Sequence, residues 1–102
     1  MSKNREELHQ ILVDILGSRN VYFQPPESIK LKYPCIIYER SYIQTVKADN
    51  TKYIEIKEYT VTVIDEDPDS EIPDKLIKLP YCSFSRHFVY DNLNHDVFTL
   101  YF

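Results

Sequence analysis

The sequence has a single glycine and no tryptophan among its 102 residues, and no run of Lys and Arg is longer than two. A Gly-rich loop that cradles phosphate cannot be built with one glycine, which excludes that kind of nucleotide site. Proteins that bind nucleic acid by neutralising phosphates need clustered basic side chains. Because such clusters are missing and the net charge is −4, direct binding of DNA or RNA is not expected.

The sequence also lacks a long apolar segment, and its first residues, MSKNREEL, are polar. A membrane span needs about 20 apolar residues and a secretion signal needs an apolar stretch, so neither a membrane partner nor secretion is expected. The two cysteines, Cys35 and Cys82, are then expected as reduced, buried hydrophobic side chains and not as a disulfide. Cys35 stands in an apolar run, where burial raises the pKa of a thiol and makes it unreactive.

Residues for a catalytic or metal site are equally scarce. The histidines are His9, His87 and His95. His87 and His95 flank the last predicted turn and can meet across a hairpin near Cys82, but the spacing is neither that of C-x-x-C nor that of H-x-x-x-H. An enzyme needs a placed nucleophile, base or metal. We therefore expect no enzyme, no catalytic residue, no metal and no cofactor.

The acidic segment 65–71 has the alternating carboxylates of a calcium loop. A calcium loop that began at Asp65 would need Gly sixth and Glu twelfth, and this sequence has Ser70 and Leu76 there. Carboxylates are also favourable at a helix N-terminus, because the exposed N–H groups attract negative charge. The segment is therefore interpreted as the start of a helix that Ser70 or Asp67 caps.

This predicted helix has Pro73 in its first turn, where the missing N–H costs little. Its apolar stripe consists of Ile72, Leu76 and Leu79, and it ends before Pro80.

A longer amphipathic helix is predicted over residues 4–16. Asn4 can cap its start together with Glu7, and Gly17 stands where a helix C-terminus needs a left-handed residue. Its apolar stripe follows the helical spacing and consists of Leu8, Ile11, Leu12, Ile15 and Leu16.

Strand patterns occupy most of the remaining chain. The predicted strands are 21–23, which Pro25-Pro26 closes, then 35–38, 53–64, 82–90 and 96–102. The polar residues 44–52 are expected as a loop, with its turn at Ala48-Asp49-Asn50. The apolar alternation of 53–64 changes phase, which indicates a bulge or a strand that leaves its cover halfway along.

The last two strands are joined by a turn predicted at 91–94. On the first of them, Cys82, Phe84, Phe88 and Tyr90 are expected to share one face. Arg86 is placed on the same face, where its charge needs an aromatic plane or an ion pair within the chain or with a neighbouring subunit. The ion pair is the prediction that we favour.

Residues 1–102 are thus predicted to form one α+β domain. Its core is a single mostly antiparallel β-sheet of about five strands with two short helices packed on one face. Two short helices leave the other face uncovered, although the last strand is apolar on both sides. Either that strand is central and buried within the chain, or a neighbouring subunit covers it.

The N-terminal helix with Asn20-Val21-Tyr22 and then 33–38 (YPCIIY) resemble the tail-terminator proteins of long-tailed bacteriophages, which are also called tail-to-head joining or tail completion proteins. Later segments resemble the small tail-region proteins of phages that infect Gram-positive hosts; these are 48–50 (ADN), 59–70 (YTVTVIDEDPDS), 83–86 (SFSR) and 92–102 (NLNHDVFTLYF). The resemblance extends in order along nearly the whole chain. The resemblance implies a single tail-terminator-like domain in a structural virion protein that has no catalytic residues.

The resemblance also implies a homo-oligomer, typically a hexameric ring, at the head-proximal end of the phage tail tube. The ring would end tube polymerisation and join the tail to the head connector. Its partners would be the major tail tube protein and the head–tail connector or stopper, and DNA would pass through without specific binding. The protein would be assembled in the host cytoplasm. The alternatives are a head–tail connector component (adaptor or stopper) or a small non-catalytic binding module.

In such a ring, the C-terminal hairpin (81–102) and the strand around 53–63 would supply much of the contact between subunits. The predicted subunit-interface residues are Tyr53, Tyr59, Val61, Arg86, Phe98, Leu100, Tyr101 and Phe102. The predicted loop that faces the lumen or the tail tube contains Lys47, Asp49, Asn50 and Lys52.

Overall fold

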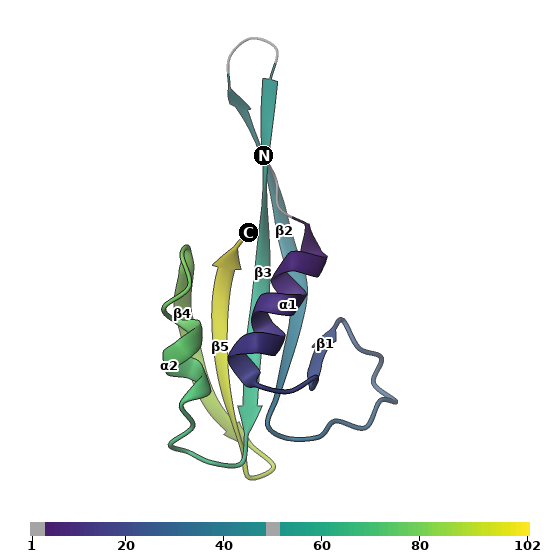
Figure 1. Cartoon of the computed structure of the whole chain (residues 1–102), viewed down its shortest axis with the longest axis vertical. Helices are drawn as coiled ribbons and strands as arrows, with labels where there is room; N and C mark the ends of the chain where they lie inside the picture. Colours follow the sequence, from purple (N-terminus) through teal and green to yellow (C-terminus); the bar gives the residue numbers. More distant parts are fainter. Residues whose placement is uncertain (1–3, 49–51) are drawn as a thin grey trace.

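The computed structural model describes residues 4–48 and 52–102, with the side chains of 46–48 and 52–54 left aside. In chain order its elements are α1 (Arg5–Leu16), β1 (Val21–Phe23), β2 (Cys35–Ala48), β3 (Lys52–Asp65), α2 (Ile72–Leu76), β4 (Cys82–Tyr90) and β5 (Leu93–Tyr101). The strands form one sheet in the order β1-β2-β3-β5-β4 (Figure 1). Only β1 and β2 are parallel neighbours. The predicted α+β class with a mostly antiparallel sheet is confirmed.

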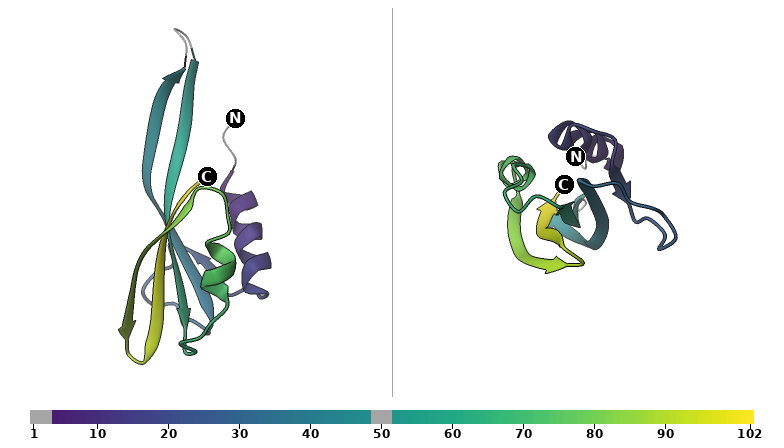
Figure 2. Two further views of the ribbon diagram at one scale, coloured as in Figure 1. Left: turned by 90° about the vertical axis from the view of Figure 1, so that its left-hand side faces the viewer. Right: turned by 90° about the horizontal axis from the view of Figure 1, so that it is seen from below.

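Both helices pack on the same face of the sheet, which we call the helix face (Figure 2). The core lies between them and the sheet, and it includes Leu8, Leu12, Ile36, Tyr38, Val61, Leu76, Phe98 and Leu100. We call the other side of the sheet the open face, because it carries no helix among the described residues. The fold therefore has two layers, and the helix layer covers one side only.

The helix α1 begins and ends as its sequence predicts. The side chain of Asn4 accepts a hydrogen bond of 2.9 Å from the Glu7 N–H, which satisfies one free donor of the first turn. Gly17 has a φ of 79° and donates its N–H to the Val13 carbonyl at 2.8 Å. This left-handed end turns the chain towards β1.

The strands β2 and β3 are longer than predicted. The prediction of a loop over 44–52 is wrong for residues 44–48. Residues 44–48 continue β2 and pair with β3 as far as Ala48 opposite Lys52. Polar side chains are compatible with strand pairing here, because this half of the hairpin projects beyond the core (Figure 1) and the backbone groups pair with each other. We call the projecting part, residues 41–48 and 52–58, the arm. The predicted turn at 48–50 lies mostly outside the described residues.

The phase change in β3 marks the point where the strand leaves the core. Tyr59 lies on the core side of this point and is buried. Ile56 lies on the other side of it and belongs to the arm. The register shift lies in β2, between Arg40 and Tyr42. Of the two explanations for the change of phase, the strand that leaves its cover is therefore the correct one.

The helix α2 is shorter than predicted. Its N-cap residue, Glu71, makes no side-chain cap hydrogen bond, while Ser70 Oγ accepts a bond of 3.3 Å from the Ile72 N–H. Asp67 accepts a hydrogen bond from the Asp69 N–H in the preceding turn and does not cap the helix. Leu79 packs against the core beyond the helix end.

The strand β4 has a register shift that changes its faces. Phe84 pairs with Phe98 on the helix face, whereas Arg86 pairs with Val97. The shift places Arg86 and Phe88 on the open face, so the prediction that Phe84 shares a face with both is wrong. The extra residue of a bulge is not visible in a pattern of apolar alternation.

The strand β5 lies between β3 and β4. It starts at Leu93, earlier than predicted, after a tight turn in which Asp91 and Asn92 have φ values of 54° and 61°. This turn conformation suits a two-residue hairpin. The apolar last strand is therefore central and is covered within the chain.

Substitution of Gly17 tests the left-handed helix end. Gly17→Ala should lower the free energy of unfolding by about 1 kcal/mol, because a Cβ is unfavourable at a φ of 79°. Gly17→Asn should cost less, since Asn tolerates this conformation better. Urea denaturation followed by circular dichroism measures both values. Equal stability of the alanine variant and the wild type would contradict this role.

Candidate functional site

Among the described side chains, the largest group of exposed apolar residues lies along β4, one edge of the sheet. Every residue of this strand after Cys82 is exposed. The large apolar side chains at this edge are Tyr81, Phe84, Phe88, Val89 and Tyr90, which we call the β4 surface. Tyr81 is 80% and Tyr90 is 72% exposed. A sheet edge with unpaired backbone groups and apolar side chains favours association with another chain.

Part of the β4 surface is held in place by ring contacts. The ring of Phe88 stacks on that of His95 with centroids 4.6 Å apart and an angle of 13° between the planes. The Arg86 guanidinium lies 5.3 Å from the Phe88 centroid. Phe84 meets Phe98 edge to face at 5.5 Å. These contacts fix the orientation of the exposed rings before any partner binds, which lowers the entropy cost of association.

Arg86 thus has an aromatic plane as its partner within the chain. Of the ion pairs formed by described side chains, none includes Arg86. Among the described residues the ion pair within the chain is therefore absent, because the bulge in β4 turns Arg86 towards Phe88. An ion pair of Arg86 with a neighbouring subunit stays a prediction.

The opposite edge of the sheet is protected. β1 has three residues, and α1 and residues 24–34 flank it (Figure 1). The Arg5 guanidinium lies over the Phe23 ring at 4.4 Å. A short, flanked edge strand offers few free backbone groups. The two edges of the sheet therefore differ, and only β4 is long and apolar.

The prediction of an interface position is wrong for four residues. Tyr59, Val61, Phe98 and Leu100 are at most 2% exposed and belong to the chain's own core. A neighbouring subunit cannot contact them while the fold is intact. The sequence left open whether the last strand was central or was covered by a neighbouring subunit. Its position between β3 and β4 shows that it is central.

The remaining predicted residues have different positions. Arg86 and Tyr101 are exposed on the open face, and a hydrogen bond to Glu58 raises the pKa of Tyr101. Phe102 is half-buried against the core. The side chain of Tyr53 lies outside the described residues.

The four predicted loop residues were expected to face a lumen or the tail tube. Asp49 and Asn50 lie outside the described residues, and so do the side chains of Lys47 and Lys52. The backbones of Lys47 and Lys52 belong to β2 and β3 of the arm. Their predicted role therefore stays a prediction, although the surrounding segment is not the expected loop.

The hairpin 81–102, predicted as a contact region, includes β4, but Arg86 is the one predicted interface residue on that strand. The exposed apolar residues of the β4 surface were not among the predicted interface residues. The sequence of β4 does indicate an edge strand, because Ser83, Ser85 and Arg86 interrupt its apolar residues. The last strand has a denser apolar pattern. A mixed strand beside a continuously apolar one is typical of an edge next to a centre.

The two histidines near the final turn do not converge. His87 Nδ1 lies 2.8 Å from Asp96 Oδ1, directly across the ladder. His95 pairs with Phe88 in the next position, so it points to the other face of the sheet. Among the described residues there is no group of three His, Cys, Asp or Glu side chains with the geometry of a metal site.

The cysteines are free thiols. Burial, with a smaller contribution from the nearby Asp65 carboxylate, raises the pKa of Cys35 to about 11. Burial also raises the pKa of Cys82. The predicted unreactive state of Cys35 is confirmed, since a thiol with this pKa is almost fully protonated at neutral pH.

One open depression, of about 320 Å³, lies between residues 24–31 and the middle of β2 and β3. Its charged lining residues are Glu27 and Glu39, and its other polar residues include Gln24, Thr60 and Thr62. Neither His nor Cys lines it. No described helix is long and apolar enough to cross a membrane.

A partly buried polar cluster joins α1 to the sheet. The hydroxyl of Tyr38, whose residue is 0% exposed, lies 2.7 Å from His9 Nδ1 and 3.2 Å from Arg5 Nη1. With neutral His9, the hydroxyl can donate to Nδ1 and accept from Arg5, which satisfies all three groups. Burial and the charge of Arg5 lower the pKa of His9.

No protein-family model matches this chain, and no curated protein matches it.

The His9 cluster predicts how stability depends on pH. The folded-state pKa of His9 lies below its usual value of 6.5, so below pH 6.5 the unfolded chain binds a proton before the folded chain does. Stability should therefore fall as the pH decreases from 6.5 towards the folded-state pKa. The measurement is urea denaturation between pH 7.5 and 5. His9→Gln should flatten this part of the profile, and an unchanged slope would contradict the role of His9.

Proposed function

We propose that this chain is a structural subunit that associates with copies of itself through the β4 surface, and that the resulting ring is the tail terminator of a long-tailed bacteriophage. The observation that supports the proposal is the exposed apolar edge of β4. The resemblance of the sequence segments to tail-terminator proteins supplies the biological role.

The β4 surface has the composition of an interface. Tyr and Phe are enriched at the centres of protein interfaces, while Lys and Glu are depleted there. No Lys, Asp or Glu stands between Tyr81 and Tyr90. A strand of nine residues is about 30 Å long, and a stable interface needs about 800 Å² from each partner. The proposed contact therefore combines the β4 edge with the neighbouring α2.

The arm gives the subunit a second contact region. It projects along the long axis of the molecule, which measures 52 × 27 × 22 Å, away from the two helices (Figure 2). Tyr42 and Ile43 are exposed on it. In a ring joined through the sides of the sheet, the arms would project towards one end of the ring. We propose that they contact the major tail tube protein or the head–tail connector.

The charge of the chain is consistent with a ring through which DNA passes. A net charge of −4 disfavours binding of phosphates along the route. His87 of β4 is held by Asp96 Oδ1 at 2.8 Å, and His95 points to the other face of the sheet, so the two histidines do not combine in one site. The proposal therefore assigns this surface to contact between proteins and not to chemistry.

Self-association is tested by a double substitution in β4 and a matched control in the arm. Val89→Glu with Tyr90→Ser places charge on the β4 surface and removes a ring, so we expect at least about a tenfold weaker assembly. Tyr42→Ser with Ile43→Glu makes the same kind of change at adjacent exposed strand positions. Light scattering after size exclusion, over a range of concentrations, measures both. The proposal fails if the two double variants assemble equally well.

The biological role is tested by deleting the gene in a virus that carries it. Loss of a tail terminator should give tails of uncontrolled length, because nothing ends tube polymerisation. Loss of a connector component should instead give tails of normal length that are separate from heads. Electron microscopy of the lysate separates these outcomes, and normal virions without this protein would exclude both roles.

A further inference from the structure

We infer that neighbouring copies join head to tail, with the β4 side of one subunit against the 24–34 side of the next. This inference rests on the proposed self-association and names the second surface that takes part in it. It follows from the distribution of charge over the two edges of the sheet.

The β4 side of the subunit is acidic. The segment 65–78 leads from β3 through α2 towards β4 and contains six carboxylates and two lysines. Glu66, Asp67, Asp69 and Glu71 are exposed. Within the described part of the chain, none of these four forms an ion pair. The segment therefore places an excess of negative charge beside the apolar β4 surface.

The opposite side of the subunit is basic. Residues 18–34 connect α1, β1 and β2, and contain three basic residues and one carboxylate, Glu27. Arg19, Lys30 and Lys32 are exposed, and no ion pair of theirs occurs among the described side chains. The same side also exposes two apolar residues, Ile29 at 39% and Tyr33 at 37%. It thus offers apolar contacts next to positive charge.

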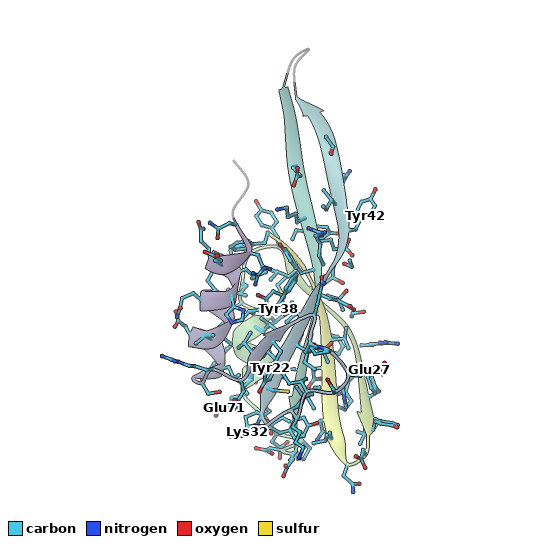
Figure 3. The ribbon with its side chains drawn as sticks, turned by 90° about the vertical axis from the view of Figure 1, so that its right-hand side faces the viewer. Tyr22, Glu27, Lys32, Tyr38, Tyr42 and Glu71 are labelled. Carbon is cyan, nitrogen blue, oxygen red and sulfur yellow. The ribbon has the colours of Figure 1, made fainter. Side chains whose placement is uncertain are left out.

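The two sides have the positions that a ring requires. Residues 24–34 lie at the β1 end of the sheet, and α2 and β4 lie at the other end (Figures 1 and 2). Figure 3 shows Lys32 and Glu71 at a similar level along the long axis, away from the arm. A lateral shift of one subunit therefore brings the basic side of one copy to the acidic side of the next. Repeated contact between two different surfaces closes a ring when the rotation allows it.

A two-fold dimer through β4 is less favourable on the same observations. Two β4 sides that met each other would bring two acidic segments, 65–78, close together. Like charges across an interface are unfavourable, and opposite charges select the partner and its orientation. The head-to-tail contact avoids this repulsion and pairs each acidic side with a basic one.

Charge reversal tests the pairing directly. One variant is Glu66→Lys with Asp69→Lys and Glu71→Lys, which leaves segment 65–78 with three carboxylates and five lysines, and the other is Lys30→Glu with Lys32→Glu. Each replaces attraction by repulsion at every contact, so each alone should raise the concentration for assembly about tenfold or more. The control is Glu6→Lys with Glu7→Lys and Asp14→Lys on α1, which changes the net charge as the first variant does and should assemble like the wild type.

Mixing the two reversed variants is the decisive step. In an alternating ring, the new positive β4 side of the first variant meets the new negative side of the second, and the remaining native sides also attract. An equimolar mixture should therefore assemble within about threefold of the wild-type concentration. In 1 M salt, where the Debye length is about 3 Å, the differences between the variants should shrink. Native mass spectrometry of the mixture should show both variants in each ring.

The outcomes separate this inference from the proposed function. If the wild type assembles and the Lys30/Lys32 variant assembles equally well, the 24–34 side is not the partner surface, although self-association through β4 stands. If the mixture of variants stays as dissociated as its components, the head-to-tail pairing is wrong. A wild type that stays monomeric at the highest concentration overturns the inference, and the proposed role in the tail is then decided by the gene deletion.

Discussion

The structure depends on how one sheet face is buried by two helices of unequal length. The longer helix, α1, packs Leu8 and Leu12 onto the sheet, and the short α2 adds Ile72 and Leu76. This cover extends over β5, because Phe98 and Leu100 join the same core. It does not extend over the far edge, and β4 is left exposed. The hydrophobic effect therefore stabilises the centre of the sheet and leaves one apolar edge free for another chain.

Much of this fold could be predicted from the sequence, because local signals determine it. The cap at Asn4 and the single glycine at Gly17 define α1, and the apolar run that begins at Cys35 defines the buried part of β2. The errors in the predicted strands occur where pairing with another strand determines the conformation. The polar residues 44–48 form a strand because β3 lies beside them. The faces of β4 depend on a bulge near Ser85 that apolar alternation does not show.

The candidate site was harder to predict than the fold for the same reason. Sequence patterns show which strands are apolar, but not their order in the sheet. The apolar last strand was therefore a reasonable candidate for the subunit contact, whereas its place between β3 and β4 buries Phe98 and Leu100. The mixed strand β4 takes the edge, and with it Val89 and Tyr90 become the exposed residues. Within the predicted contact region 81–102, the proposed contact thus shifts from the buried β5 to the exposed β4, while the proposed kind of function stays the same.

The central claim is that another copy of the chain covers the β4 edge. Hydrogen–deuterium exchange at several protein concentrations tests it most directly, because an edge strand that gains a neighbour loses access to solvent. The account predicts that amides of residues 81–90 exchange more slowly as the concentration rises, while those of α1 do not change. Equal exchange of residues 81–90 at all concentrations, in a sample that light scattering shows to be assembled, would contradict it.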